Sequence, residues 1–476
     1  MSRRREAVVL LVGALTGRGA WGEVHHGLVF DAGSSGTRIH VYTWNSGGSH
    51  GNFELVSDDL LKIKPGLSAF KSAPETAGES LTPLLTYAFE HIAEDKRKDA
   101  PAYLMATAGL RLVGEEKKDQ ILQSVCGKLD ESPFIFNCAW ATLLSGYDEG
   151  LYGWVTVNYL MKAMQSAKQK TYGTIDLGGG SVQIVFEPKS GASLPAPYLA
   201  TVPLPGGEKR VYVRSHLGYG LDEARRSIAA VVAKSGKMVH PCLPSGYIGP
   251  VVTTGGGAVE MKGSGNYAAC VQLIESIFPK AECPLAPCSI QGSYQPELNG
   301  EFIGFSYMYD RTKQIGLLDD DPQVYGEQKM DIAQIKQGAE RLCALKSDAI
   351  TRKFDKHPEA DKAQNFCGDV VFIAALIEHG FGFAPSTVFT MTNKINSIEI
   401  VWTLGAIIAK VNEGMRSGGS FALYAITALA AVALCFVVCF RRSLFGGYGL
   451  LPFRYCAHPS VPRASTPHLQ DGRAIS

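Results

Sequence analysis

The chain has 476 residues, of which 46% are hydrophobic and 19% are charged, and its formal net charge at pH 7 is +1. This composition is that of a globular protein, and the length predicts two domains of roughly 200 residues each. Because electrostatic capture of nucleic acid needs a strongly basic surface, the near-neutral charge argues against a nucleic-acid-binding protein.

Residues 1–20 have the character of a secretory signal peptide. A basic start is followed by a short apolar run and by small residues near Ala20. The apolar run is too short to span a membrane.

The stretch 28–44, LVFDAGSSGTRIHVYTW, predicts two strands joined by a loop of small residues. Such a loop lets backbone N–H groups and hydroxyl groups converge on phosphate oxygens. The loop residues that could do so are Ser34, Ser35, Gly36 and Thr37. Asp31, at the end of the first strand, can hold a hydrated divalent cation. Taken alone, a loop of this kind is more often an ordinary hairpin turn.

The next part of the chain alternates between strand and helix patterns, which predicts an α/β layer. Strands are expected at 101–110 and 133–140, and helices at 81–98, 115–129 and 151–169. Thr107 offers a hydroxyl donor within the first of these strands. The segment 140–160 carries Asp148 and Glu149, which suit the capping of a helix start. Glu149 also suits a general base that activates water beside a phosphate.

Residues 173–188, GTIDLGGGSVQIVFEP, form a second, partial copy of the first loop. Placing Asp176 over Asp31 also aligns Gln183 with Arg38, at a spacing of 145 residues. The loop itself contains Gly178, Gly179, Gly180 and Ser181. Two similar copies this far apart predict two lobes built alike.

The remaining chain contains further helix patterns and one irregular region. Helices are expected at 223–235, 330–345 and 370–378, and a disulfide-rich insertion at 236–300. Residues 421–440 are uncharged and are followed by two arginines, which predicts a transmembrane helix with a cytosolic tail at 441–476. A buried core helix is the alternative. We therefore expect a type I single-pass membrane protein.

Eight of the 11 cysteines precede residue 421. An even number in an exported domain predicts four disulfides, which spacing alone leaves open among 105 pairings. Free buried thiols are the alternative. Paired CxxC motifs are absent from the sequence, so a zinc site is not expected.

Five segments together resemble the apyrase-conserved regions of the nucleoside triphosphate diphosphohydrolase (apyrase) family. They are VFDAGSSGTRIHVY, MATAGLRLV, LLSGYDEGLYGWVTVNYL, GTIDLGGGSVQIVF and TNKINSIEIVWTLGA, in that order over about residues 27–412. The resemblance implies an α/β fold of two similar actin/hexokinase-like (ribonuclease H-like) lobes, with the nucleotide in the cleft between them. We expect lobe I at 27–155 with 397–415 returning to it, and lobe II at 156–396.

The resemblance also implies roles for individual residues. Glu149 corresponds to the general base, Ser181 and Gln183 help to position the water, and Thr107 lies beside the reacting phosphate. Asp31 and Asp176 correspond to carboxylates that hold Ca²⁺ or Mg²⁺ through its water shell. The implied phosphate contacts are Ser34, Ser35, Gly36, Thr37, Gly178, Gly179 and Gly180. Tyr307 and Trp402 fall where aromatic rings pack on the nucleobase, although a buried aromatic without a ligand is the alternative for each.

Other features bear on the substrate and on the disulfides. Gly36 stands where the family's surface branch often has histidine, and the chain is more similar to the endomembrane branch, which prefers nucleoside diphosphates. Cys283 and Cys288 resemble a short disulfide loop of the surface branch, so nucleoside triphosphates also stay open as substrates.

The resemblance pairs Cys242 with Cys270 and Cys343 with Cys367, and proximity in the sequence pairs Cys126 with Cys138.

We therefore expect a hydrolase in the secretory-pathway lumen (ER/Golgi) or at the cell surface. It would remove the terminal phosphate of UDP, GDP or ADP, and of triphosphates, through water activated by Glu149. The alternatives are a surface apyrase acting on ATP and ADP, a kinase of the same fold, a non-catalytic type I receptor and an actin-like chaperone. A kinase would need a second substrate pocket, for which the sequence shows no feature, and a receptor has no use for a base.

Overall fold

The structure is a computed structural model that describes residues 23–33, 36–46, 53–111, 113–278, 282–314 and 328–412. The expected signal peptide, transmembrane segment and cytosolic tail lie outside these residues, as do Ser34 and Ser35. Among the residues that the structure describes, no helix combines the length and the apolar character needed to cross a membrane.

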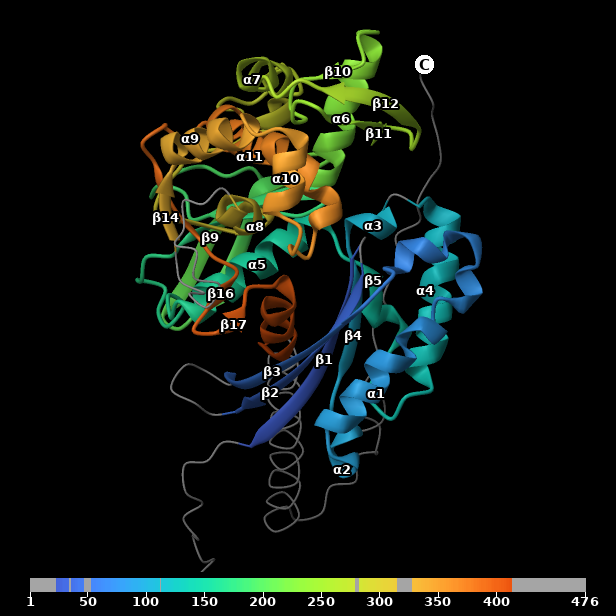
Figure 1. Cartoon of the computed structure of the whole chain (residues 1–476). Helices are drawn as coiled ribbons and strands as arrows, with labels where there is room; N and C mark the ends of the chain where they lie inside the picture. The colour runs from blue at the N-terminus through green and yellow to red at the C-terminus, as the bar shows by residue number, and fades with distance from the viewer. Residues whose placement is uncertain are drawn as a thin grey trace, which may run out of the picture. The chain divides into compact units, whose positions relative to one another are not determined.

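A five-stranded sheet forms the first half of the fold, in the order β3-β2-β1-β4-β5 (Figure 1). Its strands are β1 (Val24–Ala32), β2 (Thr37–Asn45), β3 (Glu54–Ile63), β4 (Ala102–Ala106) and β5 (Ala141–Leu143). The first three strands pair antiparallel, and β4 and β5 continue the sheet in parallel with β1.

A seven-stranded sheet, in the order β14-β15-β13-β6-β7-β9-β8, forms the second half. Its strands are β6 (Gly173–Leu177), β7 (Ser181–Phe186), β8 (Leu199–Leu204), β9 (Gly207–Leu217), β13 (Phe302–Ser306), β14 (Gln328–Asp331) and β15 (Val388–Met391). Its central order β9-β7-β6-β13-β15 repeats both the order and the directions of β3-β2-β1-β4-β5. The expected α/β fold with a duplicated architecture is confirmed.

Helices α1 (Thr82–His91) and α4 (Glu115–Asp130) cover one face of the first sheet (Figure 1). Each buries residues three or four positions apart, such as Ile121, Val125 and Leu129 on α4. This spacing places an apolar stripe along one side of the helix. The stripe packs against alternate residues of β1 and β2, including Phe30 and Val41.

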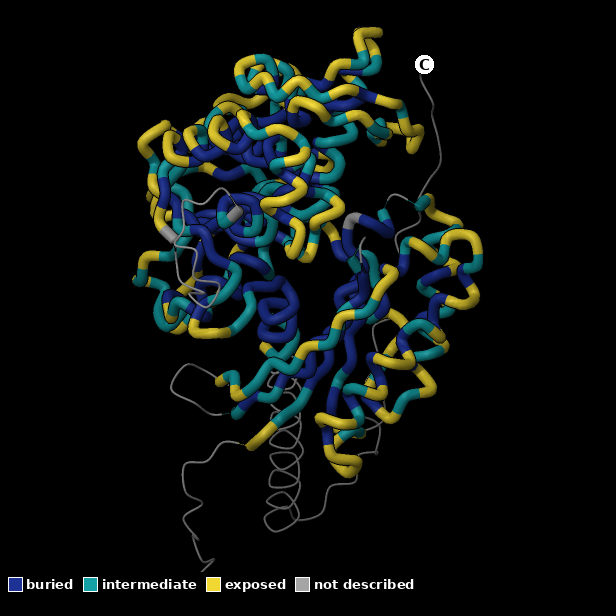
Figure 2. Tube along the Cα trace, in the orientation of Figure 1, coloured by how far each residue is buried: buried dark blue, intermediate teal, exposed yellow. Residues whose placement is uncertain are grey.

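The opposite face of this sheet and the inner face of the second sheet share one hydrophobic core. Helix α5 (Gly146–Leu160) and the helical residues 402–412 lie in this core, which is buried in Figure 2. The Tyr42 hydroxyl on β2 lies 2.7 Å from the Thr403 hydroxyl. A side chain at Gly405 would collide with the Tyr152 backbone, so glycine permits the close approach of the two helices.

The outer face of the second sheet is covered by the remaining helices, with α6, α9 and α11 packed in one large core. These helices are α6 (Leu221–Lys234), α7 (Tyr267–Glu275), α8 (Tyr307–Gln314), α9 (Ile332–Cys343), α10 (Ser347–Lys353) and α11 (Phe366–Ala375), which continues as a π-helical turn (Leu376–Gly380). A small three-stranded sheet contains β10 (Val239–His240), β11 (Ile248–Val252) and β12 (Ala258–Gly263). A two-stranded sheet contains β16 (Lys394–Ile395) and β17 (Ile398–Glu399). Short helices are α2 (Glu94–Arg97) and α3 (Ala108–Arg111).

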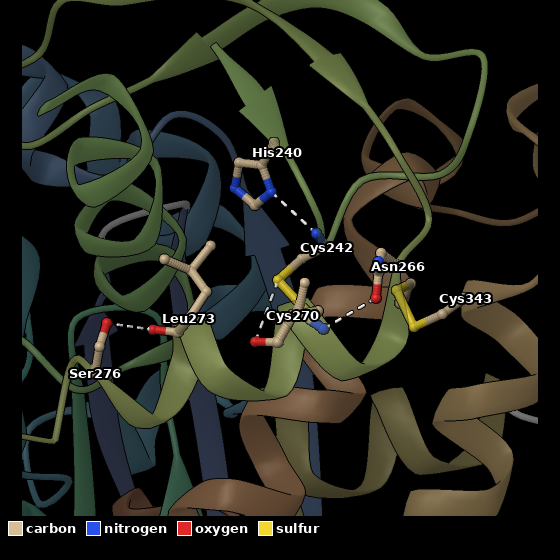
Figure 3. The surroundings of a disulfide bond; sticks show 9 residues. His240, Cys242, Asn266, Cys270, Leu273, Ser276 and Cys343 are labelled. Atoms are coloured by element: carbon tan, nitrogen blue, oxygen red, sulfur yellow. Dashed lines mark hydrogen bonds between the residues drawn. A yellow bond between two sulfur atoms is a disulfide. The ribbon is translucent and has the colours of Figure 1, made fainter. Parts of the chain in front are cut away.

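Four disulfides join Cys126–Cys138, Cys242–Cys270, Cys283–Cys288 and Cys343–Cys367, which are the pairs expected from the sequence. Figure 3 shows the Cys242–Cys270 bond beside Cys343, which belongs to a second bond. The ring of His240 accepts a hydrogen bond from the Cys242 N–H at 3.2 Å. The expected insertion is not irregular throughout, because it contains β10, β11, β12 and α7.

The strand predicted at 133–140 is wrong. Only an isolated bridge at Ile135 forms there, and the paired strand is β5, which follows it. The Asn137 side chain accepts a hydrogen bond from the Ala139 N–H, and this bond caps a 3-10 turn (Cys138–Trp140) in place of a strand.

Other predicted elements have shifted ends. The strand predicted at 101–110 ends at Ala106 and is followed by helix α3. The helix predicted at 151–169 begins earlier, because the Ser145 hydroxyl accepts the Asp148 N–H as an N-cap. It ends at Leu160, just before Lys162, whose φ is 56°. The expected lobe boundary at 155/156 therefore falls within α5, and the lobe limits stay a prediction.

Candidate active site

Two equivalent cross-strand rows of residues adjoin the two loops. In the first sheet Asp31 on β1 pairs with Arg38 on β2, which pairs with Lys62 on β3. In the second sheet Asp176 on β6 pairs with Gln183 on β7, which pairs with Ser215 on β9. Since residues directly opposite each other in a sheet share a face, each row presents its side chains together.

Asp31 is a buried carboxylate with one oxygen left without a partner. Its side chain is 11% exposed, and the Arg38 Nε lies 3.4 Å from Oδ2. Among the residues that the structure describes, its Oδ1 has no hydrogen-bond partner. Burial raises the pKa of Asp31, and the positive charge of Arg38 opposes that rise. Arg38 also lies 3.8 Å from Glu399 of β17.

Asp176 is the buried carboxylate of the second row. Burial raises its pKa to about 6, a hydrogen bond from Ser306 opposes the rise, and the charge of Asp31 adds to it. The structure therefore brings Asp31 and Asp176, which lie on different sheets, close enough for the charge of Asp31 to disfavour the ionised form of Asp176.

Glu149 lies in the first turn of α5, where Ser145 caps the helix. The Arg111 guanidinium donates to Glu149 Oε2 at 2.6 Å. Burial raises the pKa of Glu149 to about 7, the Arg111 charge lowers it, and the Asp176 charge raises it. A carboxylate that titrates near neutrality suits a general base. Asp148, its neighbour, bonds to Ser145 and belongs to the cap.

Gln183 connects the base to the second loop. Its Nε2 lies 2.8 Å from Ser181 Oγ, 3.0 Å from Ser215 Oγ and 3.4 Å from Glu149 Oε2. The structure thus brings together Glu149, Ser181 and Gln183 as the sequence predicts. It adds Arg111 and Ser215, which the sequence analysis did not assign, although Arg111 lies in the quoted segment MATAGLRLV.

The described residues beside the first loop pack closely against β3 and against Thr107. A Cβ at Gly36 would lie 2.6 Å from the Ile63 carbonyl oxygen, so only glycine fits there without displacement of β3. Thr37 is fully buried, and no described residue forms a hydrogen bond with its hydroxyl. Thr107 lies next to the loop because its N–H donates to the Ala32 carbonyl at 3.2 Å. Thr107 is 8% exposed.

The second loop has its carbonyl groups turned toward α6. The Gly178 carbonyl accepts from Leu221 N–H at 2.9 Å, and the Gly179 carbonyl accepts from Asp222 at 3.0 Å. The Gly180 carbonyl accepts from Gly218 N–H at 2.9 Å. Because the N–H and C=O of a peptide unit point in opposite directions, these bonds direct loop N–H groups away from α6. Such N–H groups can bind an anion.

The two predicted nucleobase residues differ in surroundings. Tyr307, the first residue of α8, is partly exposed and follows Ser306, the hydrogen-bond partner of Asp176. The Arg311 guanidinium lies over the Tyr307 ring at 4.8 Å. Trp402 is 5% exposed and packs in the core between the sheets. That position leaves little Trp402 ring surface for a base.

The donor set fits a hydrated divalent cation. Among the described residues, no group of three or more His, Cys, Asp or Glu side chains could hold a metal ion. Asp31 and Asp176 nevertheless provide two buried carboxylates, one with an unpartnered oxygen. A divalent cation that keeps several of its waters can bind through one or two carboxylates, so this pair suits a hydrated divalent cation.

These features define a class. An α/β fold with duplicated sheets, a glycine-rich loop beside a buried aspartate, and a buried glutamate whose pKa is raised to about 7 suits transfer of a phosphoryl group to water. The comparisons agree with this class: residues 20–417 match the GDA1/CD39 (nucleoside phosphatase) family, and the chain belongs to that family.

Curated relatives carry related names. The chain is 33% identical over 405 residues to the human "Nucleoside diphosphate phosphatase ENTPD5", covering 80% of this chain and 86% of the relative. It is 32% identical over 425 residues to "Guanosine-diphosphatase" of Schizosaccharomyces pombe, covering 81% of this chain and 73% of the relative. Nucleoside triphosphate hydrolases from Neospora caninum share the fold, with a TM-score of 0.59, 14% identity and coverage of 81% and 92%.

Proposed function

We propose that the chain hydrolyses the terminal phosphate of nucleoside diphosphates such as UDP, GDP and ADP, and that of triphosphates. The relatives named for nucleoside diphosphate and guanosine diphosphate hydrolysis support the diphosphate preference. The observation that carries the proposal is the position of Glu149, whose Oε2 lies 3.4 Å from Gln183 Nε2 and whose pKa is raised to about 7 by burial.

In the proposed mechanism, Glu149 takes a proton from water as the water attacks the terminal phosphorus. The bond from that phosphorus to the bridging oxygen breaks, and inorganic phosphate and the shortened nucleotide are the products. Gln183 and Ser181 orient that water. The N–H groups of the second loop bind oxygens of the reacting phosphate, while Thr37, Thr107 and the first loop bind from the other sheet. Asp31 and Asp176 would hold a Ca²⁺ or Mg²⁺ ion through water, and the bound ion would neutralise phosphate charge.

The proposed site also has positive charge beside the first loop. Arg38 and Lys62 share a row with Asp31. Burial and the neighbouring Arg38 charge lower the pKa of Lys62, as expected for two adjacent cations. Both charges suit a nucleotide whose phosphates are negative.

We propose the secretory-pathway lumen or the cell surface as the location. The four disulfides support it, because disulfides persist in oxidising compartments. A signal peptide at 1–20 and a membrane helix at 421–440 would give the expected type I topology.

A surface apyrase acting on ATP and ADP is the second candidate. It is favoured by similarity to the Bos taurus "Ectonucleoside triphosphate diphosphohydrolase 1", at 29% identity over 445 residues, covering 85% of each chain.

The test is phosphate release from UDP, GDP, ADP and ATP by the full chain in detergent, with Ca²⁺, with Mg²⁺ and with chelator. We expect faster release from UDP or GDP than from ATP, and none with chelator. Faster release from ATP and ADP would support the second candidate, and absence of release from all four would refute both.

A further inference from the structure

Ser215 lies at a junction between the second sheet and the helix that carries the base. It is directly opposite Gln183 in the β7–β9 ladder, and its hydroxyl is 3.0 Å from Gln183 Nε2. Its side chain also packs against Gly146 at the start of α5, where an added Cβ would lie 2.3 Å from Ser215 Oγ. Ser215 is therefore in contact with both the water-positioning amide and the base-bearing helix.

The hydrogen bonds of Gln183 determine which way its amide faces. A side-chain amide has two N–H donors on nitrogen and one acceptor oxygen. Ser181 Oγ at 2.8 Å and Ser215 Oγ at 3.0 Å are the two nearer acceptors of Nε2, and Glu149 Oε2 at 3.4 Å is beyond an ordinary hydrogen bond. The two serines thus occupy both N–H groups, and Oε1 is left to accept a hydrogen bond.

We propose that Ser215 is a positioning residue for the hydrolysis, acting through Gln183. By accepting the second N–H of the amide, Ser215 keeps Oε1 directed toward the attacking water. One hydrogen of that water is then held by Gln183 Oε1, and the other proton passes to a Glu149 oxygen as the bond from the water oxygen to phosphorus forms. The bond from the terminal phosphorus to the bridging oxygen breaks in the same reaction, and the shortened nucleotide leaves with that oxygen and its electron pair. This inference rests on the proposed function.

Without Ser215, the amide loses one of its two fixed partners. The freed N–H can turn toward Glu149 Oε2, which would occupy the base and misdirect Oε1. Because this change affects the reacting water and not the nucleotide contacts, kcat should fall while KM stays the same. The loss of one orienting hydrogen bond corresponds to about a tenfold change in rate.

A double-mutant cycle tests the proposal, with wild type, Ser215→Ala, Gln183→Ala and the double variant as full chains in detergent. Initial rates of phosphate release from GDP and UDP give kcat and KM, with more enzyme used for slower variants. We expect Ser215→Ala to lower kcat about tenfold with KM within about twofold. In the Gln183→Ala background the same change should have no further effect, because Ser215 acts through the amide.

Thr201→Ala is the matched control, since it removes a hydroxyl from an exposed position on β8 of the same sheet. It should leave kcat and KM unchanged, and thermal melting should show that both hydroxyl variants fold. An equal loss in both backgrounds, or a Ser215→Ala enzyme with wild-type kcat, would overturn the inference. A wild type that releases no phosphate would instead refute the proposed function, so the two failures are distinguishable.

Discussion

Glu149 is buried, has a charged partner in Arg111 and lies beside the Gln183 amide. Burial makes its ionised form costly, and the Arg111 guanidinium at 2.6 Å partly offsets that cost. The balance leaves a carboxylate with a pKa of about 7. Such a group is ionised often enough to act as a base and holds a proton strongly enough to accept one.

Replacement of Glu149 by alanine should lower kcat by on the order of 10² or more, as loss of a general base does. The substitution also leaves the largely buried Arg111 guanidinium without its carboxylate partner, so the melting temperature should fall while the protein still folds. Phosphate release and thermal melting measure the two effects. A variant with wild-type turnover would exclude Glu149 as the base.

Replacement of Arg111 by methionine should move the pH dependence of kcat/KM. Arg111 lowers the pKa of Glu149, so its removal should raise that pKa above about 7. Since the base must be deprotonated, activity is lost below its pKa, and the acid limb should shift to higher pH. Rates from pH 5.5 to 9 measure the shift. A limb that stays in place or moves to lower pH would contradict this account.

The site residues fall into two groups by how far sequence could locate them. Glu149, Ser181 and Gln183 lie in recognisable motifs, and the structure brings their side chains together. The sequence gives Ser215 no role, because its contact with Gln183 depends on the register between β7 and β9. Trp402 does lie in a recognisable motif, but packing of the 402–412 helix buries its ring, and the motif alone could not reveal that burial.

At the scale of elements, the second loop and the start of α6 form one unit. Four backbone hydrogen bonds join the carbonyl groups of Gly178, Gly179 and Gly180 to N–H groups of residues 218–223. The N-terminal N–H groups of a helix have no partner within the helix, so α6 satisfies them with loop carbonyls. This arrangement fixes the loop before any phosphate binds.

Replacement of Gly220 by alanine should weaken nucleotide binding. Its Cβ would lie 2.3 Å from Ser181 N and 2.5 Å from the Gly179 carbonyl carbon, so the loop would have to shift. We expect KM to rise about tenfold, as for loss of an oriented hydrogen bond. Gly127→Ala on α4 is the control, because nothing lies within 4 Å of the added Cβ. The Gly127→Ala variant should stabilise the protein and leave KM unchanged. An unaltered KM in Gly220→Ala would contradict the prediction.

The element predictions failed where local contacts and caps decide the structure. The apolar run at 133–140 suits a strand, but Cys138 is bonded to Cys126 on α4 and the adjoining turn is capped by Asn137. Periodicity locates α4 within one residue, because a buried stripe defines it. Helix α5 is buried on nearly all sides, so periodicity could not locate its ends.

At the scale of the whole molecule, each of the two duplicated sheets contributes one aspartate to the candidate site. Asp31 and Asp176 occupy equivalent positions in the two copies, and each lies at the end of the first strand of its sheet. The charge of Asp31 raises the pKa of Asp176. A cation between them would relieve this repulsion and would connect the two sheets.

Ca²⁺ or Mg²⁺ should therefore raise the melting temperature of the full chain by a few degrees at saturation, by mass action. The rise should shrink below about pH 6, because Asp176 takes up a proton there and a protonated carboxylate is a poor ligand. Asp31→Asn and Asp176→Asn should each lose the rise at pH 7.5. Asp310→Asn is the matched control, since burial also raises the Asp310 pKa to about 6 but its partner is Asn393. The Asp310→Asn variant should keep the rise in melting temperature. If the rise were equal at pH 5 and pH 7.5, or if the Asp176→Asn variant kept it, the cation would bind elsewhere.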